Sequence, residues 1–145
     1  MAYKGKFKPT NISKYLGDHT KIRFLSLWEK QLMGWLDTNI HVVQWSSEIP
    51  IKYVCGTDMK VHKYLVDFYI ATSDGRRLLV EVKPYKQTIE PKEPKRRTRR
   101  SVNESYTWVK NNSKWDAARE LCAINNMKFV IWTENELKMM GLKII

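Results

Sequence analysis

Hydrophobic residues recur along the chain at two different spacings, and the change from one to the other separates predicted helices from predicted strands. In residues 25–37 they recur every third or fourth position, which is typical of a helix with one buried face. Ser26 stands at the start of this pattern and Glu29 follows three positions later, a combination that fits a capping box. The sequence therefore predicts a first helix that begins near Ser26.

Two more helices and several strands are predicted after it. A second helix spans 104–126, and its apolar stripe is formed by Trp108, Trp115, Ala118, Leu121 and Cys122. Thr133 followed by Glu136 predicts a short capped helix near the end of the chain. Runs rich in β-branched and aromatic residues predict strands at 41–45, 49–54, 63–71, 77–83 and 127–132. This order predicts an α/β fold with a central mixed β-sheet flanked by helices.

A tight turn fixes the register of two of these strands. The loop at 73–75 has three residues and ends in glycine, which suits a common hairpin geometry. Such a loop places Thr72 opposite Arg76, and therefore Asp67 opposite Glu81. Directly opposed residues project from the same face of a sheet, so these two carboxylates are expected to lie side by side.

The two faces of this hairpin differ in chemistry. One face is wholly apolar and is expected to be core, because it carries Val66, Phe68, Ile70, Leu78, Val80 and Val82. The other face carries Leu65, Asp67, Tyr69, Leu79, Glu81 and Lys83. Neighbouring carboxylates among hydrophobic residues are unfavourable unless a cation lies between them, and oxygen ligands suit Mg²⁺ or Mn²⁺. An ordinary ion pair between Lys83 and Glu81 is the alternative, but it leaves Asp67 without a partner.

Such a site is suited to reactions at phosphate groups. A divalent ion between the carboxylates can polarise a phosphate and activate water, and Lys83 beside it can orient that water or stabilise the transition state. The chain carries a formal net charge of +11, which favours a polyanionic partner.

The positive charge is concentrated in two segments. Residues 1–21 hold five lysines against one acid, and residues 83–100 hold eight basic side chains against two acids. We interpret residues 1–24 as a basic N-terminal arm and residues 84–101 as a mobile basic loop, since the loop is rich in proline and charge. Beside a candidate phosphate-cleaving site, a clamp on the phosphates of a polyanion such as double-stranded DNA is favoured over a solvated linker or a nuclear-type targeting patch. The expected DNA contacts are Lys86, Lys95, Arg96, Arg97, Arg99, Arg100 and Lys114.

Several residue types argue against other functions. Cys55 and Cys122 are far apart, outside any C-x-x-C spacing, and are expected to be reduced. The three histidines show no ligand spacing, so a structural role is expected for His62. No apolar run has the length of a membrane span, and the start of the chain lacks a signal peptide. We therefore expect one domain over residues 1–145, made and used in a cytoplasm.

The candidate site resembles a known nuclease signature. Asp67, followed on the next strand by Glu81-Val82-Lys83, is similar to the PD-(D/E)XK motif of the restriction-endonuclease-like fold. The resemblance implies that Glu29, on the first helix, completes a metal site with Asp67, Glu81 and the main-chain carbonyl of Val82. Glu29 also fits a helix cap, and both roles stay open. One departure is Val66, which stands where the motif's name has proline.

Longer segments of the sequence resemble two more particular families of nucleases. YKGKFKP, SLWE, VQWSSE, HKYLVDFYI and VEVKPYKQT are similar to the head completion nucleases of myovirus-type tailed phages, and also to TnsA-type transposase endonuclease subunits. The resemblance implies a Mg²⁺-dependent (or Mn²⁺-dependent) DNA endonuclease that processes DNA ends during head completion, with portal or head proteins as partners. Two alternatives stay open: a non-catalytic head-completion protein that binds the DNA terminus or portal, and a transposon-end endonuclease subunit. The oligomeric state and any association with the virion are not fixed by the sequence.

Overall fold

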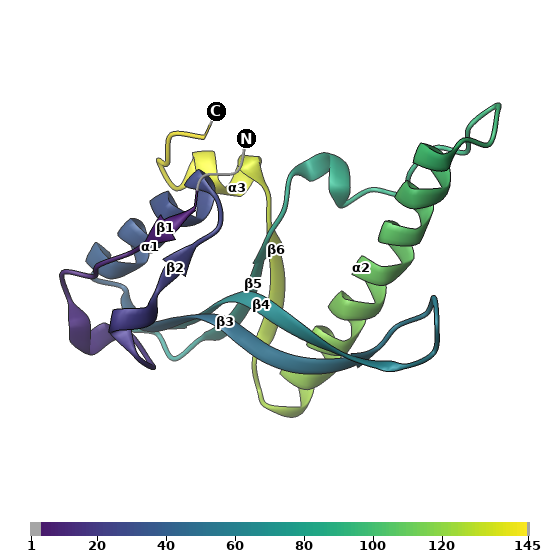
Figure 1. Ribbon diagram of the computed structural model, residues 1–145. Coiled ribbons are helices and arrows are strands. Elements are labelled where there is room, and N and C mark those ends of the chain that lie inside the picture. The colour runs from purple at the N-terminus through teal and green to yellow at the C-terminus, as the bar shows by residue number, and fades with distance from the viewer. Residues whose placement is uncertain (1–3, 145) are drawn as a thin grey trace.

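The structure, a computed structural model, describes residues 4–144 and contains a four-stranded sheet (Figure 1). Its strands are β3 (Val42–Val54), β4 (Val61–Thr72), β5 (Arg77–Val82) and β6 (Lys128–Trp132). They lie in the order β3-β4-β5-β6, and the first three are antiparallel, whereas β5 and β6 are parallel. The predicted mixed sheet is confirmed.

Two hydrophobic clusters join the sheet to its helices. The first lies between the sheet and α1 (Leu27–Thr38), which buries Leu32, Met33 and Leu36. The second lies between the sheet and α2 (Arg99–Ile124), which buries Trp115, Ala118 and Cys122. Figure 1 shows α1 and α2 on either side of the strands, with the short α3 (Glu134–Met139) following β6. The two helices therefore bracket the strands that carry the candidate site.

The predicted hairpin register is confirmed. Phe68 pairs with Val80 and Ile70 with Leu78, which is the register that places Asp67 opposite Glu81. In the turn the N–H of Thr72 donates to the carbonyl of Arg76 at 2.9 Å. Gly75 has a φ of +87°, a value that residues with a Cβ rarely adopt. The apolar face is core as expected, since Val66, Phe68, Ile70 and Val80 are at most 1% exposed.

Three details of the predicted elements are wrong. The strands expected at 41–45 and 49–54 are one strand, β3, because pairing with β4 continues through the polar residues between them. Leu121 is 39% exposed, so it does not belong to the buried stripe of α2. The second helix begins at Arg99 instead of 104, because the side chain of Thr98 caps it by accepting from the N–H of Ser101. Arg99 and Arg100 are therefore helical, although they were expected in the loop.

The segment expected to form an N-terminal arm packs against the rest of the chain in its described part, residues 4–24. It contains β1 (Gly5–Lys6) paired with β2 (Arg23–Phe24), and two 3-10 turns, η1 (Ile12–Lys14) and η2 (His19–Lys21). Phe24 is 4% exposed, and the buried carboxylate of Asp37 accepts from the backbone N–H groups of Thr10 and Asn11. Residues 1–3 of the expected arm, and residue 145, lie outside the described residues.

Among residues 4–144, no helix combines the length and the apolar character needed to cross a membrane.

Candidate active site

The two predicted carboxylates lie where β4 separates from β5. Backbone pairing of the two strands ends at Phe68 and Val80, and Asp67 and Glu81 are the next residue on each strand. There the N–H of Val82 donates to Oδ2 of Asp67 at 2.8 Å. Because β5 continues to pair with β6 on its other side, Val82 is fixed, and its N–H holds the Asp67 carboxylate in place.

Glu81 has a buried oxygen with no hydrogen bond. Its residue is 5% exposed, and Oε1 has no hydrogen-bond partner among residues 4–144. Oε2 lies 4.0 Å from Nζ of Lys83, at the limit of an ion pair. An unsatisfied buried carboxylate oxygen is costly, and the pair with Lys83 leaves that cost in place. The arrangement fits a carboxylate whose missing partner is a cation.

Glu29 comes to the same region from the start of α1. The Glu29 N–H donates to Oγ of Ser26 at 3.2 Å, so half of the predicted capping box is present. The Glu29 carboxylate accepts from the N–H of Leu25 at 3.4 Å, a long contact that satisfies it poorly. Burial raises the pKa of Glu29, and the negative charges of Glu48 and Glu81 raise it further.

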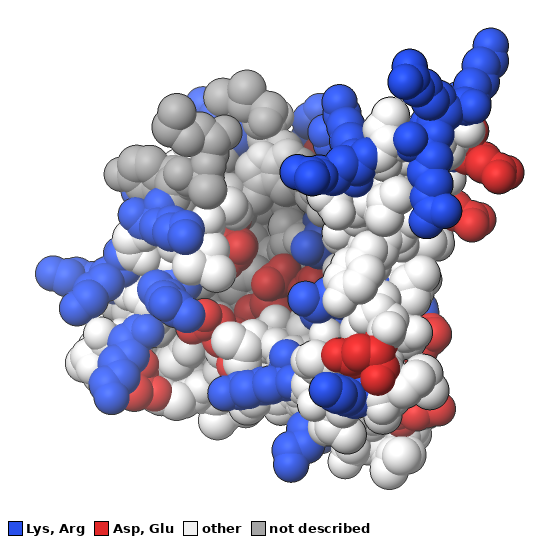
Figure 2. All heavy atoms as spheres, turned by 45° about the vertical axis from the view of Figure 1, so that its right-hand side comes forward, with Lys and Arg blue, Asp and Glu red and all other residues white. Residues whose placement is uncertain are grey.

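Burial and neighbouring negative charges act together on Asp67. Burial raises the pKa of Asp67 well above its ordinary value, and the charges of Glu81 and Glu29 add to the rise, whereas the N–H of Val82 opposes it. Figure 2 shows acidic side chains at the floor of a hollow, with Lys and Arg side chains along its edges. Three carboxylates that share a poorly solvated site are the donor set that a hard divalent cation neutralises.

Two residues near the acidic group were not assigned to it from the sequence. Tyr64 is 3% exposed, its hydroxyl has no hydrogen-bond partner among the described residues, and burial with the charges of Glu81 and Asp67 raises its pKa. Nζ of Lys114 lies 5.3 Å from the centre of the Tyr64 ring. Burial lowers the pKa of Lys114, as do the charges of Lys110 and Lys83. Strand alternation gives no signal for Tyr64, because it places this residue on the face opposite Asp67.

Apart from Lys114, the basic residues expected to bind DNA fall into two groups. A pocket of about 910 Å³ lies between the loop after β5 and the first half of α2. Lys86, Arg99 and Arg100 line it, together with the half-buried Trp108. Lys95, Arg96 and Arg97 are exposed on the loop between η3 (Tyr85–Gln87) and α2.

Three other aromatic or polar residues, from α2 and from the segment after β5, have defined environments in the structure. Trp115 is 2% exposed and is core, so it cannot stack on a base. Asn111 is 6% exposed, which makes it a buried residue at the pocket and not an open phosphate contact. Tyr85 is exposed, and its N–H donates to the carboxylate of Glu134 at 2.7 Å.

The mixed sheet, its flanking helices and the acidic cluster define a class of protein, a nuclease on a restriction-endonuclease-like core. Residues 39–134 match the family model of the TnsA-like endonuclease N-terminal domain, and the chain belongs to this family. The head completion nuclease of Enterobacteria phage T4 is 42% identical to this chain over 148 residues, covering 99% of each sequence. The expected fold and nuclease class are confirmed. Asp67, Glu81 and Lys83 lie within the matched segment, whereas Glu29 precedes it.

Proposed function

We propose that this chain is a metal-dependent DNA endonuclease that processes DNA ends during phage head completion. The single observation that carries the catalytic part is the buried Oε1 of Glu81, which has no hydrogen-bond partner among residues 4–144 and belongs to the residue opposite Asp67 on the neighbouring strand. The part about head completion is supported by the full-length similarity to the T4 head completion nuclease.

The site residues have distinct roles in this proposal. Asp67, Glu81 and Glu29 would hold the ion, with the main-chain carbonyl of Val82 as a further ligand. Their oxygen atoms suit Mg²⁺ or Mn²⁺ better than a softer metal. When bound, the ion would supply Lewis-acid polarisation of the scissile phosphate and a lowered pKa for the attacking water.

Lys83 acts on the substrate and not on the ion. Its ammonium group has only donors, so it can orient water or stabilise negative charge on the phosphate, but it cannot coordinate a cation. Lys114 on α2, which is half-buried and whose pKa is lowered by burial against the opposing effect of the charges of Glu81 and Asp67, would assist Lys83. The N–H of Val82 keeps the Asp67 carboxylate oriented throughout.

Double-stranded DNA is the proposed substrate, and portal or head proteins are the proposed partners. The phosphate contacts are assigned to the basic side chains Lys86, Lys95, Arg96, Arg97, Arg99, Arg100 and Lys114. Contacts to phosphates carry no sequence information, so this group gives affinity and not specificity. The protein would act in the host cytoplasm or on the virion.

Plasmid cleavage tests the proposal directly. The purified chain should nick or linearise plasmid DNA with Mg²⁺ or Mn²⁺ and should be inactive with a chelator. Asp67→Asn and Glu81→Gln should each abolish cleavage while circular dichroism stays unchanged. Glu120→Gln is the matched control, because Glu120 is exposed on α2, and it should keep full activity. Cleavage that survives in Asp67→Asn would remove this residue from the active site.

Two other functions are weighed against this proposal, and the plasmid assay tests the first of them. A purely structural head-completion protein would bind DNA ends but leave the plasmid intact with every divalent ion. A transposon-end endonuclease is the second alternative. It is disfavoured because the T4 relative is matched over 99% of its length, whereas the TnsA-like model matches only residues 39–134.

A further inference from the structure

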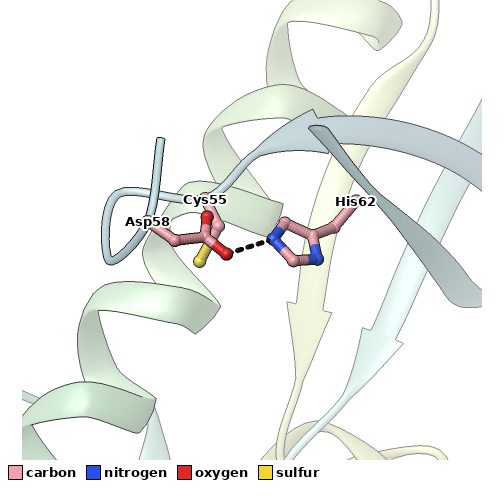
Figure 3. A group of neighbouring side chains, drawn as sticks. All are labelled: Cys55, Asp58 and His62. Carbon is pink, nitrogen blue, oxygen red and sulfur yellow. Dashed lines mark hydrogen bonds and ion pairs between the residues drawn. The ribbon is translucent and has the colours of Figure 1, made fainter. Parts of the chain in front are cut away.

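The tip of the β3–β4 hairpin carries a second group of possible metal ligands. Cys55, Asp58 and His62 each offer one ligand atom, and the three atoms all lie within 4.8 Å of one another. Figure 3 shows the Asp58 carboxylate facing the imidazole of His62, with the Cys55 sulfur next to the carboxylate. None of these residues belongs to the acidic cluster of Asp67, Glu81 and Glu29.

The turn that brings them together is fixed by its backbone. The N–H of Cys55 donates to the carbonyl of Lys60 at 3.0 Å, and the N–H of Met59 donates back to the carbonyl of Cys55 at 2.8 Å. The N–H of Lys60 donates to Oδ1 of Asp58 at 2.9 Å, which holds this side chain across the turn. Met59 adopts a φ of 57°, an uncommon conformation for a residue with a side chain.

The individual atoms are well disposed for a cation. With Oδ1 of Asp58 occupied by the backbone, Oδ2 is the oxygen that faces Nε2 of His62 at 2.7 Å. Ligand atoms around a tetrahedral Zn²⁺ are roughly 3.4 Å apart, so the Asp58 and His62 atoms, now 2.7 Å apart, need to separate by about 0.7 Å. Cys55 is 2% exposed, and hydrogen bonds from Thr57 lower the pKa of its thiol.

We propose that Cys55, Asp58 and His62 form a site for a borderline-soft divalent metal such as Zn²⁺, separate from the acidic cluster. Thiolate, imidazole and carboxylate together are the ligand types that Zn²⁺ prefers, whereas Mg²⁺ prefers oxygen alone. Three protein ligands leave a fourth tetrahedral position for water. Binding displaces the thiol proton of Cys55 into solvent, since the thiolate is the coordinating form.

The position of the site suggests what the metal does. The turn already touches α2: the N–H of Gly56 donates to Oγ of Ser113 at 3.0 Å, and the hydroxyls of Thr57 and Tyr106 are hydrogen-bonded at 3.2 Å. A Cβ added to Gly56 would lie 3.1 Å from a methyl group of Val109. A metal that clamps the turn would therefore stabilise this close contact between the hairpin and α2.

Co²⁺ is the probe for the first experiment, because a thiolate ligand gives it a charge-transfer absorption that carboxylates do not. The full chain, stripped with a chelator, should develop this absorption on titration with Co²⁺. Zn²⁺ should displace it, and a large excess of Mg²⁺ should not. Cys55→Ser should lose the absorption, whereas Cys122→Ser, which changes the other buried cysteine, should keep it. Asp67→Ala should also keep it, because the two sites are separate.

His62→Gln covers the case in which Cys55→Ser fails to fold, since His62 is half-exposed. It should weaken Co²⁺ binding on the order of a hundredfold, since loss of even an outer-shell partner costs roughly 10–100-fold. Zn²⁺ should raise the melting temperature of wild type and not that of His62→Gln. The proposal is overturned if wild type shows no thiolate absorption, if Cys55→Ser retains it, or if Mg²⁺, Cys122→Ser or Asp67→Ala removes it.

Discussion

At the scale of single residues, the candidate active site is a repulsive group held together by neighbouring structure. The N–H of Val82 fixes Asp67, burial deprives Glu81 of water, and the start of α1 brings in Glu29. Without a cation this arrangement is destabilising, because each carboxylate raises the energy of the others. In the proposed function, this mutual repulsion is what would favour the binding of a cation.

Stability in the absence of metal should depend on pH through Asp67. Its pKa is higher in the folded than in the unfolded chain, so between those two values the folded state binds more protons. Stability should therefore fall as pH rises above about 4, through the raised pKa of Asp67. Melting temperatures measured with chelator over a pH series should show a smaller fall for Asp67→Asn than for wild type.

The control for that series is Asp74→Asn. The side-chain hydrogen bond from Thr72 lowers the pKa of Asp74, so this carboxylate contributes stability above its unfolded pKa and loses it on acidification. Replacing Asp74 should therefore change the pH dependence in the opposite direction. Identical pH dependence of wild type and Asp67→Asn would mean that the Asp67 carboxylate ionises normally.

A metal-binding assay should distinguish the role of Lys83 from that of the metal-binding carboxylates. Lys83→Ala should lose most of the cleavage rate and keep Mn²⁺ binding, because an ammonium group cannot coordinate the ion. Glu81→Ala should lose both. Calorimetric titration with Mn²⁺, run beside plasmid cleavage, makes the distinction. If Lys83→Ala loses metal binding as completely as Glu81→Ala does, then Lys83 only supports Glu81 and takes no part in the reaction.

At the scale of elements, the sequence predicts what local spacing determines. The 73–75 turn sets the register of β4 and β5, and that register alone places Asp67 beside Glu81. The position of Tyr64 near Glu81 could not be predicted in this way. It depends on how the hairpin bends and not on the alternation of side chains along β4. The contacts of Gly56 and Thr57 with α2 are of the same kind. Sequence patterns report the faces of an element and carry little information about its curvature.

The start of α2 shows how a local signal can be hidden by composition. Thr98 and Ser101 form a reciprocal cap, yet they stand in a segment so rich in charge and proline that it was interpreted as loop. Thr98→Ala should destabilise the first turn by about 1 kcal/mol. Amide hydrogen exchange there should then be roughly fivefold faster, since 1.4 kcal/mol is a factor of ten. The exposed Thr107→Ala, within the same helix, should leave it unchanged, and equal exchange in Thr98→Ala would show that the cap contributes nothing.

At the scale of the whole molecule, charge is divided between an acidic floor and basic edges (Figure 2). The net charge of +11 draws DNA to the protein, whereas the acidic cluster alone would repel it. Binding and catalysis are thus assigned to different residues, and the basic side chains can be removed without touching the carboxylates. The same separation allows the basic loop to be tested by itself.

The last prediction concerns five residues of that loop and helix start. Replacing Lys95, Arg96, Arg97, Arg99 and Arg100 with serine should weaken binding to every DNA sequence alike. Each phosphate contact contributes about 0.9 to the slope of log affinity against log salt, so losing five should lower the slope by roughly 4 to 5. The measurement is binding to a short duplex over a salt series, with Ca²⁺ in place of Mg²⁺ to prevent turnover. Cleavage at saturating DNA should persist, because the carboxylates are unchanged.

A charge-matched control distinguishes local contacts from the general effect of net charge. It replaces five exposed lysines elsewhere with serine: Lys21, Lys52, Lys128, Lys138 and Lys143. Both variants lose the same five charges, so long-range attraction falls by a similar amount in each, and only the loop variant should lose contact-dependent counterion release. If the two variants lower the slope equally, the loop makes no particular contact with DNA. The contacts with DNA phosphates would then have to come from other basic residues, such as Lys4, Lys6 and Lys8 near the N-terminus.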